Sequence, residues 1–478
     1  MDLDCFSLLF CYENKKIRRS IILKIFFTVS IVFAVLYSLF FHTTTIIPIM
    51  ETWDRIALSS FIPFSINIQY NVIQCITIIF SSNIFPSKRI DSFDVLKIKP
   101  FTNFTYIFSK AINIISTFAI INLLVNTIVL FIHICFINGP INIGYYLLAI
   151  AYISLAASIF IVGLSFFIQS LFGSSSISNI LTCIAIIIFY EFSSIGYGSL
   201  DLFCLNIPTV FSDLIGMVNF TTFIYQRLFF LFCGIGLLFL TTININRICY
   251  IKKNKHLILF TGLIIIVLAN VCLFRFANTF YKTQETRVVY TQTYRKYFSE
   301  YNVDVIDYDI SIKFSHQTIN AQSILSLTNS HSINITRPIL FLNPSLKIES
   351  ISCNHIPVEF SREHQVVILN KPIIPHDTIK LEIIYSGFID ERICYVDIED
   401  KKFYEYYSNF LNNSEKIYHY ISDEYVILTP ECLWYPVSLT GINLSSRWNS
   451  KRTFSNFKLK VEHSQNLKAI SQGQKHIT

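Results

Sequence analysis

The chain has 478 residues, of which 53% are hydrophobic and only 14% are charged. This composition excludes a string of average soluble domains and indicates that much of the chain lies in lipid. Gly and Pro, at 13 each, are too few for a collagen-like or low-complexity chain. The 12 cysteines fall mostly inside apolar runs and include no Cys-x-x-Cys pair, so most of them are expected to be small buried hydrophobic residues.

The net charge of +7 comes almost entirely from the first part of the chain. Residues 1–274 hold 16 Lys/Arg and 10 Asp/Glu, whereas the remainder holds 22 and 21. A nucleic-acid-binding protein needs a basic stripe on one soluble face, but this excess sits in short segments between apolar runs. The charge pattern therefore indicates membrane topology and no nucleic-acid partner.

Seven apolar stretches before residue 275 are suited to cross about 30 Å of hydrocarbon, which takes roughly 17 to 25 helical residues. The fifth is the shortest, and the first is too long for a cleavable signal peptide. We expect transmembrane helices at Ile21–Phe41, Ser59–Ser81, Ala111–Phe136, Tyr145–Leu171, Asn179–Ile195, Phe223–Ile243 and Leu257–Phe274.

Basic residues between these stretches favour one orientation. With a cytoplasmic N-terminus, 14 Lys and Arg residues flank the inner loops and only Arg55 and Arg227 flank the outer ones. Cytoplasmic loops carry the excess of Lys and Arg, so the inverted orientation is disfavoured. We expect a multi-pass protein of the cell membrane whose residues after Phe274 are extracytoplasmic.

The second stretch carries Asn67, Asn71 and Gln74 at spacings that place them on one helical face. Polar groups are costly in lipid, so this face should point into the bundle. It could line a substrate path, or it could only hold helices together by hydrogen bonds. Glu191, near the outer end of the fifth stretch, is expected to be an interfacial carboxylate.

The inner segment from Asn83 to Lys110 carries Arg89, Asp91, Pro100, Tyr106 and Lys110 in an order that resembles the inner loop of type 2 ATP-binding-cassette (ABC) permeases. In that family a short helix in this loop docks on a separate ATPase. The resemblance, over about residues 1–245, implies a cytoplasmic ATPase partner and pairing with a second permease copy or a similar subunit. The implied docking residues are Lys88, Arg89, Asp91, Lys97 and Lys99. The chain has no P-loop motif, so any ATP hydrolysis would come from the partner.

After the seventh stretch the hydrophobic period changes to two. Apolar side chains alternate with polar ones from Tyr308 to Phe314, from Ile379 to Tyr385 and from Phe457 to Val461. Such alternation is typical of half-buried strands. Turn signals between them, such as Asn343-Pro344 and Ser386-Gly387, predict an antiparallel β-sandwich.

Five sequence words in this region occur in the order seen at the start of aminopeptidase N family zinc peptidases. They begin at Tyr308 (YDISI), Leu342 (LNPSLKI), Ile384 (IYSG), Leu428 (LTPECLWYP) and Phe454 (FSNFKLKVE). The region from 303 to 473 thus resembles that family's N-terminal β-domain. The whole chain resembles fusions of a permease-like membrane domain with an aminopeptidase-like outer region.

The family's catalytic zinc motif is missing from this sequence. His-Glu-x-x-His works because two histidines at i and i+4 share a helical face and bind the metal beside a general base. None of the 11 histidines has that spacing, and no Gly-x-Met-Glu-Asn stretch occurs. We therefore expect no peptidase activity and no cofactor in this chain, which would be a fragment or a truncated product. Zinc would be needed only if a catalytic domain followed.

Two features of the outer region are candidate binding sites. Glu431 lies where the family binds a substrate amine, so it could be a remnant of amine recognition, although a structural role is favoured. Trp434 and Tyr435 could form an aromatic surface, but packing in the core is favoured. Cys353, Cys394 and Cys432 would face an oxidising compartment, and no pairing among them follows from the sequence.

Four regions result from these patterns: a permease-like membrane domain (1–245), a basic loop with a seventh transmembrane helix (246–276), a juxtamembrane connector (277–302) and an incomplete β-sandwich (303–478). The leading hypothesis is a permease subunit of an ABC exporter-type system. The alternatives are the membrane anchor and first domain of a zinc aminopeptidase, and an anchored binding or scaffold module.

Overall fold

The structure is a computed structural model of the chain, and two units emerge from it, one up to Phe280 and one from Tyr281 onward. The described residues are 3–46, 58–84, 101–136, 140–173, 175–193, 198–205, 220–245, 255–297, 302–396, 419–423, 425–438, 454–463 and 467–474.

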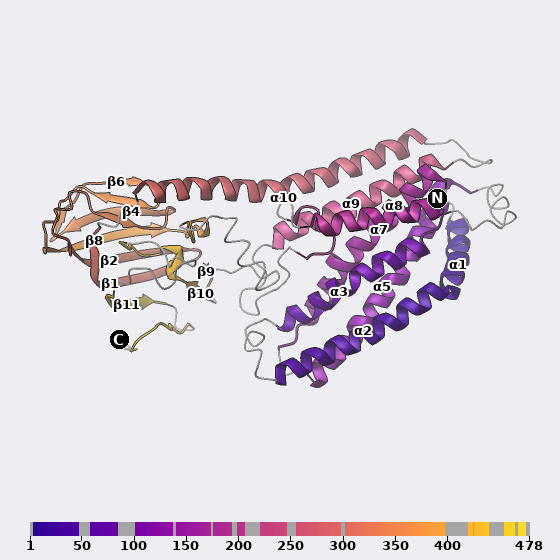
Figure 1. Cartoon of the computed structure of the whole chain (residues 1–478), viewed down its shortest axis with the longest axis horizontal. Coiled ribbons are helices and arrows are strands. Elements are labelled where there is room, and N and C mark those ends of the chain that lie inside the picture. Colours follow the sequence, from indigo (N-terminus) through magenta and orange to yellow (C-terminus); the bar gives the residue numbers. More distant parts are fainter. Residues whose placement is uncertain are drawn as a thin grey trace. The chain divides into compact units, whose positions relative to one another are not determined.

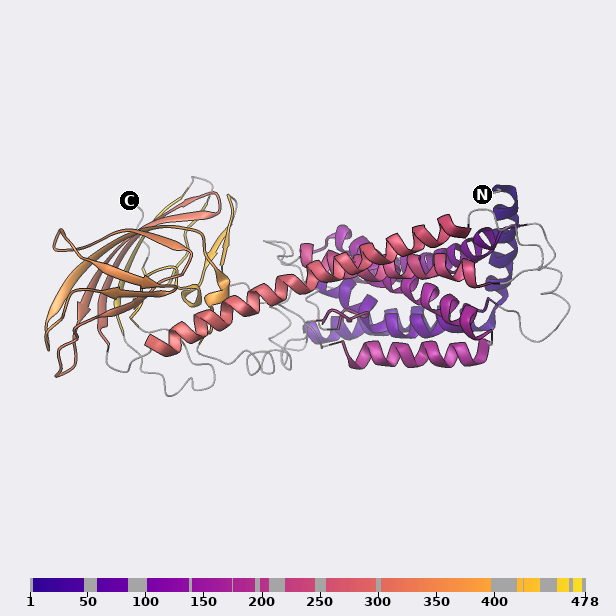
Figure 2. The ribbon, with the colours of Figure 1, turned by 90° about the horizontal axis from the view of Figure 1, so that it is seen from above.

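The first unit is a bundle of helices that run roughly side by side (Figures 1 and 2). Its apolar core joins residues from most of these helices, including Phe26, Phe118 and Phe166. The elements are α1 (Leu3–Arg19), α2 (Ile21–Ile46), α3 (Leu58–Ser81), α5 (Asn103–Phe136), α6 (Ile143–Ala149), η3 (Ile150–Leu155, a π-helix), α7 (Ala156–Phe172), α8 (Ser175–Glu191), α9 (Phe220–Asn244) and α10 (Lys255–Tyr297).

Within the described residues, six helical segments are long and apolar enough to cross a membrane. They correspond to six of the seven predicted stretches, since α6, η3 and α7 form one continuous segment from Ile143 to Phe172. The remaining one, the fifth predicted stretch, corresponds to α8, which has only 17 residues and falls short in length. Its outward side chains are nevertheless apolar, with Ile180 and Ile187 61% and 59% exposed. Exposed aliphatic faces of this kind suit contact with lipid.

Most of the expected juxtamembrane connector (277–302) is helical. The α10 helix continues without a break from Lys255 to Tyr297. Beyond Gly262 this helix contains neither Gly nor Pro, and its polar part is rich in Lys, Arg, Gln and Thr. Nothing in that segment stops helix propagation, so the helix extends beyond its apolar stretch.

The second unit is built of strands in three sheets. A six-stranded sheet has the order β11-β1-β2-β8-β4-β5, a three-stranded sheet has the order β3-β7-β6, and β10 pairs with β9. The elements are β1 (Asp304–Ser315), β2 (Thr318–Thr328), β3 (Ile339–Phe341), β4 (Leu346–Cys353), β5 (Ile356–Pro357), β6 (Phe360–Glu363), β7 (Val366–Leu369), β8 (Thr378–Gly387), η5 (Glu391–Ile393), β9 (His419–Ile421), β10 (Val426–Leu428), η6 (Pro430–Cys432) and β11 (Asn456–Glu462).

The predicted alternation is present, but the pairing is not purely antiparallel. Tyr308, Ile310 and Ile312 of β1 are buried while the residues between them are not. The β11 strand pairs in parallel with β1, with Ile310 opposite Leu459, so the large sheet is mixed. Alternation reports only which face of a strand is buried and is the same for both directions of pairing.

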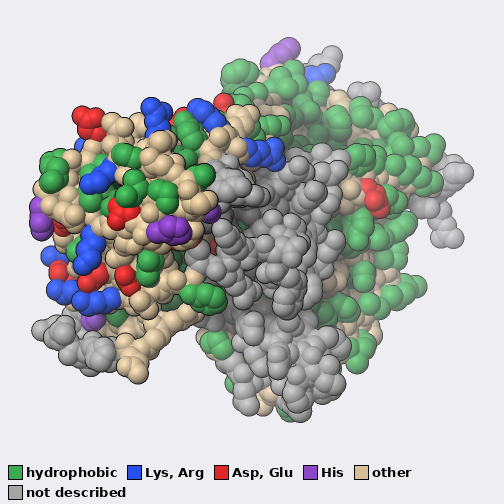
Figure 3. Space-filling view, turned by 60° about the vertical axis from the view of Figure 1, so that its left-hand side comes forward, with side chains coloured by type: hydrophobic (Ala, Val, Ile, Leu, Met, Phe, Trp, Pro, Cys, Tyr) green, Lys and Arg blue, Asp and Glu red, His purple; other side chains and the backbone are tan. Residues whose placement is uncertain are grey.

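One apolar core serves the second unit. It contains residues from the six-stranded sheet, such as Tyr385, and from the three-stranded sheet, such as Leu340. Tyr290 and Tyr294 of α10 and Trp434 after η6 belong to it too. The two units also differ on the surface, because hydrophobic side chains cover the helices and mixed charges cover the strands (Figure 3).

Candidate functional site

The polar face of α3 lies inside the helical bundle. Asn67, Asn71 and Gln74 are each 0% exposed. Helical periodicity gives them a common direction, and the neighbouring helices α5 and α7 and the π-helix η3 supply the polar atoms that face them. The group is therefore a polar seam within an otherwise apolar core.

Asn67 is the centre of this seam. Its Nδ2 donates to Oδ1 of Asn126 at 2.8 Å, and its Oδ1 accepts from Oγ of Ser154 at 2.9 Å. The hydroxyl of Tyr70 donates to Oδ1 of Asn122 at 2.7 Å and to Oδ1 of Asn67 at 3.2 Å. Five buried polar side chains from three elements thus share one hydrogen-bond network.

Below Asn67 along α3 the network is incomplete. Nε2 of Gln74 donates to Oγ of Ser158 at 2.7 Å. Among the described residues, Nδ2 of Asn71 and Oε1 of Gln74 are buried and have no hydrogen-bond partner. An unpaired buried amide atom costs roughly 1 to 3 kcal/mol, so a native protein seldom leaves two without a partner of some kind.

The π-helix η3 contributes to the same seam. It spans Ile150–Leu155, between α6 and α7, and Ser154 lies in it. Single π-turns inside α-helices are frequent at functional sites. No periodicity in the sequence indicated this turn, and we did not predict it.

Two residues of the permease-like loop pattern are described, and both make buried contacts. The hydroxyl of Tyr106 donates to the backbone carbonyl of Ile84 at 2.9 Å. Nζ of Lys110 lies 3.8 Å from Oε1 of Glu13, and both side chains are almost fully buried. Asn113 on the next turn donates to the carbonyl of Phe10 at 2.8 Å. These contacts fix the amphipathic helix α1 against α5.

The predicted docking residues lie outside the described residues. Lys88, Arg89, Asp91, Lys97 and Lys99 all fall between 85 and 100. The basic residues of α1 are described, and Lys15, Lys16, Arg18 and Arg19 are exposed. The helix therefore presents a row of cations on the side away from its contacts with α5.

The charge pattern identifies Arg227 only as a residue that flanks an outer loop, yet the residue is 2% exposed. Its guanidinium donates to the backbone carbonyls of Asp201 and Leu202, the latter at 2.9 Å. The side chain also lies over the rings of Phe223 and Phe230, 5.8 and 5.3 Å from their centroids. Arg227 thus holds the 198–205 segment to α9, a role that sequence reasoning missed.

In the strand unit, Glu431 lies in the short 3₁₀ turn η6. Its Oε1 accepts from the hydroxyl of Tyr395 at 3.4 Å, and its Oε2 is buried without a hydrogen-bond partner among the described residues. Trp434 is 7% exposed and packs edge-on against Tyr435, 4.6 Å between centroids. The aromatic pair therefore belongs to the core rather than to a binding surface.

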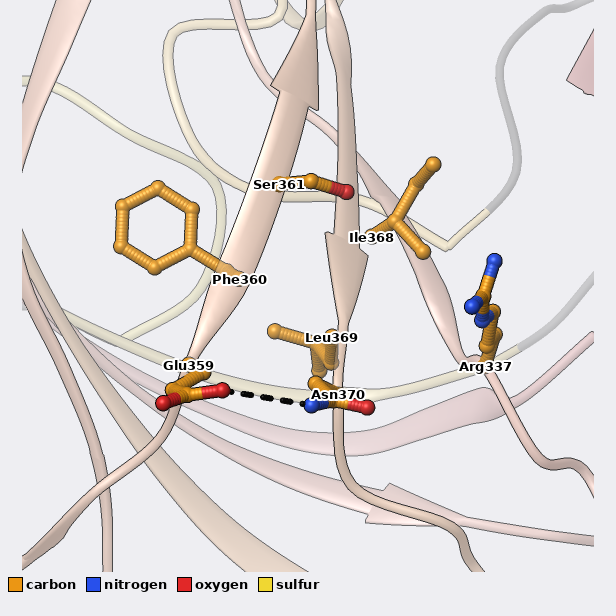
Figure 4. A pocket seen from close by; sticks show the side chains of 7 residues that line it. All are labelled: Arg337, Glu359, Phe360, Ser361, Ile368, Leu369 and Asn370. Carbon is orange, nitrogen blue, oxygen red and sulfur yellow. Dashed lines mark hydrogen bonds between the residues drawn. The ribbon is translucent and has the colours of Figure 1, made fainter.

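A shallow pocket of about 270 Å³ lies at the edge of the three-stranded sheet (Figure 4). Ser361 of β6 and Ile368 of β7 line it, and Arg337 stands at one side. Oε2 of Glu359 and Nδ2 of Asn370 face each other at 3.4 Å. The polar groups do not converge on one point, so this pocket has the character of a surface depression.

No protein-family model matches the chain. No curated protein matches it either. Among solved structures, an M1 zinc metallopeptidase from Deinococcus radiodurans is similar at 20% identity over 19% of this chain and 21% of that chain, with a TM-score of 0.17. A two-domain M1 zinc metallopeptidase mutant bound to L-arginine is similar at 16% identity over 29% of each chain, with a TM-score of 0.21.

The chain spans less than a third of the length of the solved structures it matches. TM-scores of this size assign neither a fold nor an activity to it. The residues present do not fit the catalytic zinc of those peptidases, because this sequence lacks the His-Glu-x-x-His motif that would bind it.

Proposed function

We propose that the chain is the membrane subunit of an ABC exporter-type system, with ATP hydrolysed by a separate cytoplasmic ATPase. The observation that carries this proposal is the polar seam around Asn67, buried between helices long enough to cross a bilayer. Polar groups inside membrane helices are costly and mark substrate paths or helix contacts.

The unpaired atoms favour a substrate path over simple helix contacts. A network that only held helices together would pair its groups, as Asn67 and Asn126 do. Asn71 and Gln74 instead keep one amide atom each without a partner among the described residues. The seam carries no charged side chain, so it suits a cargo with neutral hydrogen-bonding groups.

The N-terminal helix supports the proposal of an ATPase partner. Glu13 and Ile17 are buried on one face of α1, and Lys15 and Lys16 are exposed on another. A basic amphipathic helix is suited to the cytoplasmic membrane surface, where anionic headgroups attract Lys and Arg. Such a helix would present cations at the cytoplasmic surface, where we expect the ATPase to dock.

Co-purification from native membranes tests the partnership. We expect an ATPase to accompany the tagged chain and to be lost when Lys88, Arg89, Lys97 and Lys99 are changed to Glu. The matched control changes Arg247, Lys252, Lys253 and Lys255 of the other basic inner loop to Glu and should retain it. Recovery of no ATPase with the wild-type chain contradicts the proposal.

A reporter fused after Thr478 tests the orientation. Alkaline phosphatase folds and is active only outside the cytoplasm of a bacterium, so we expect activity at this position. A fusion after Lys253, in the predicted inner loop, should be inactive. Activity with the reverse pattern would place the strand unit in the cytoplasm.

A second candidate is the membrane anchor and first domain of a zinc aminopeptidase. In its favour, the five sequence words overlap regular elements: YDISI lies in β1, LNPSLKI runs into β4, IYSG ends β8, LTPECLWYP covers the end of β10 and η6, and FSNFKLKVE runs into β11. Reading the coding sequence beyond Thr478 for His-Glu-x-x-His tests this candidate. Zinc-dependent aminopeptidase activity of the 478-residue chain itself would contradict the view that this chain is not a peptidase.

A further inference from the structure

Three metal-ligand side chains meet where two 3₁₀ turns and a short strand of the second unit come together, and a fourth, Cys394, lies beside one of them. Glu391 begins η5, Cys432 ends η6 and His419 begins β9. Their ligand atoms all lie within 4.8 Å of one another. Cys394, just after η5, places its Sγ 3.9 Å from Sγ of Cys432, although 38 positions separate the two residues.

The spacing of these atoms is close to that of a tetrahedral metal centre. Two thiolates bound to one Zn²⁺ at about 2.3 Å lie roughly 3.8 Å apart in a tetrahedral arrangement. The thiols of Cys394 and Cys432 are 3.9 Å apart. The Nδ1 of His419 lies 3.0 Å from Oε1 of Glu391. Glu391, His419 and Cys432 already have ligand atoms within 4.8 Å of one another, so a shift of Cys394 toward them would complete a sulfur, nitrogen and oxygen set around one ion.

The imidazole of His419 directs a ligand atom at Glu391. Its Nδ1 is buried and makes no hydrogen bond to any described residue, but it lies within ion-pair distance, 3.0 Å, of Oε1 of Glu391. Nearby, Oε2 of Glu431 is buried and lacks a hydrogen-bond partner in the same described part of the chain. Buried polar atoms nearly always have hydrogen-bond partners, and a cation between the imidazole, the carboxylate and the Cys432 thiol would supply one for atoms that lack it here.

The surroundings hold these ligands in place and balance their charge. The backbone N–H of His419 donates to Oε1 of Glu391 at 2.7 Å, which fixes the carboxylate. A guanidinium nitrogen of Arg287 donates to the carbonyl of Cys394 at 2.8 Å. This cation would offset the negative charge of two thiolates and a carboxylate around a divalent ion. Outer contacts of this kind orient metal ligands.

We propose that the strand unit binds one Zn²⁺ at this cluster, which is a structural site rather than the catalytic zinc site of a peptidase. Thiolate and imidazole ligands select zinc over Ca²⁺ or Mg²⁺. Binding releases the thiol protons to solvent. It also cross-links η5 to β9 and η6, two elements that are far from η5 in the sequence. The four ligand atoms are Sγ of Cys394, Sγ of Cys432, Nδ1 of His419 and Oε1 of Glu391.

Metal titration of the full chain in detergent, with its thiols kept reduced by a phosphine, tests the site. We expect about one tightly bound Zn²⁺ per chain, and with Co²⁺ a sulfur-to-metal charge-transfer band together with the visible bands of tetrahedral cobalt. Zinc should raise the unfolding temperature of the strand unit, and a chelator should lower it. A reduced, folded chain that binds no zinc overturns the proposal.

Variants assign the ligands. We expect Cys432→Ser and His419→Gln each to weaken zinc binding at least tenfold and to remove or shift the cobalt bands. The matched controls are Cys353→Ser, a buried cysteine of the same unit, and His364→Gln, and both should bind zinc as the wild type does. Unchanged binding by a folded Cys394→Ser, Cys432→Ser double variant overturns the site. Isolation of a Cys394–Cys432 disulfide from native membranes, with no zinc binding after its reduction, also overturns it.

Discussion

Lys110 of α5 and Glu13 of α1 form an ion pair buried within the helical unit. Nζ and Oε1 are 3.8 Å apart, and the side chains are 4% and 5% exposed. Lys110 also lies over the ring of Tyr106, with Nζ 5.7 Å from its centroid. The pair joins the amphipathic N-terminal helix to the bundle at a residue that the sequence pattern placed in an inner loop.

Removing one member of this pair should destabilise the helical unit. Lys110→Met leaves the Glu13 carboxylate buried and uncompensated, which typically costs about 3 to 5 kcal/mol. The double variant with Glu13→Gln should recover most of that loss. Unfolding in mixed detergent measures the difference, and the exposed Lys16→Met is the control. If the stability loss of the double variant equals the sum of the losses of the two single variants, the residues do not interact.

The contact between α7 and α9 depends on two glycines. A Cβ added to Gly234 would lie 2.6 Å from the carbonyl oxygen of Ile159, and one added to Gly163 would meet the Gly234 carbonyl. Small residues permit such close approach of membrane helices. We expect Gly234→Ala to lower the unfolding temperature strongly.

Gly173 is the matched control for this substitution. Its φ of +66° strains any other residue, but a Cβ there meets nothing within 4 Å. Gly173→Ala should therefore cost only about 1 kcal/mol. Equal losses at Gly173 and Gly234 would contradict close helix packing as the cause.

Replacing Asn67 tests the polar seam. Asn67→Leu removes the partner of Asn126 and Ser154, and hydrogen bonds between membrane helices contribute roughly 0.6 to 2 kcal/mol each. We expect lower stability and, if the seam conducts cargo, a loss of transport larger than the loss of folded protein. Asn270→Leu, at an exposed position of α10, is the control for both measurements. If the Asn67→Leu variant transports cargo as well as the wild type, the seam only holds helices together and does not line a substrate path.

The strand unit should lose stability in acid through Asp390. Burial alone would raise the pKa of Asp390, but hydrogen bonds from Arg392 and Tyr290 hold this pKa below its ordinary value. Stability from the ionised carboxylate is therefore present above the unfolded-state pKa of about 3.9 and is lost as the pH falls through the lower folded-state pKa.

Fluorescence of the buried Trp434 between about pH 5 and about pH 1 reports this unfolding. Asp390→Asn should lower stability at pH 7 by roughly 2 kcal/mol, because it removes charged hydrogen bonds, and should flatten the acid dependence. The exposed Asp309→Asn should leave the pH profile unchanged. A profile for Asp390→Asn as steep as that of the wild type would assign the acid loss to other carboxylates.

Local periodicity explains what could be anticipated from the sequence. The apolar stretches coincide with the helices because transfer free energy sums over neighbouring residues. The alternation from Tyr308 to Phe314 lies within β1 for the same local reason. The spacing of Asn67, Asn71 and Gln74 places them on one face whatever helix lies opposite. The extension of α10 beyond its apolar stretch was not predicted, because an apolar stretch marks the part of a helix that contacts lipid and does not mark where the helix ends.

Local sequence patterns predict which segments are helical and apolar and which faces are polar, and the sequence contains neither a P-loop nor a His-Glu-x-x-His motif. The contact of Lys110 with Glu13, the parallel pairing of β11 with β1 and the approach of Cys394 to Cys432 are visible only in the folded chain. The physical reason is that helix and strand patterns depend on neighbours a few positions apart. Contacts across tens of residues depend on how whole elements pack, which no short spacing encodes.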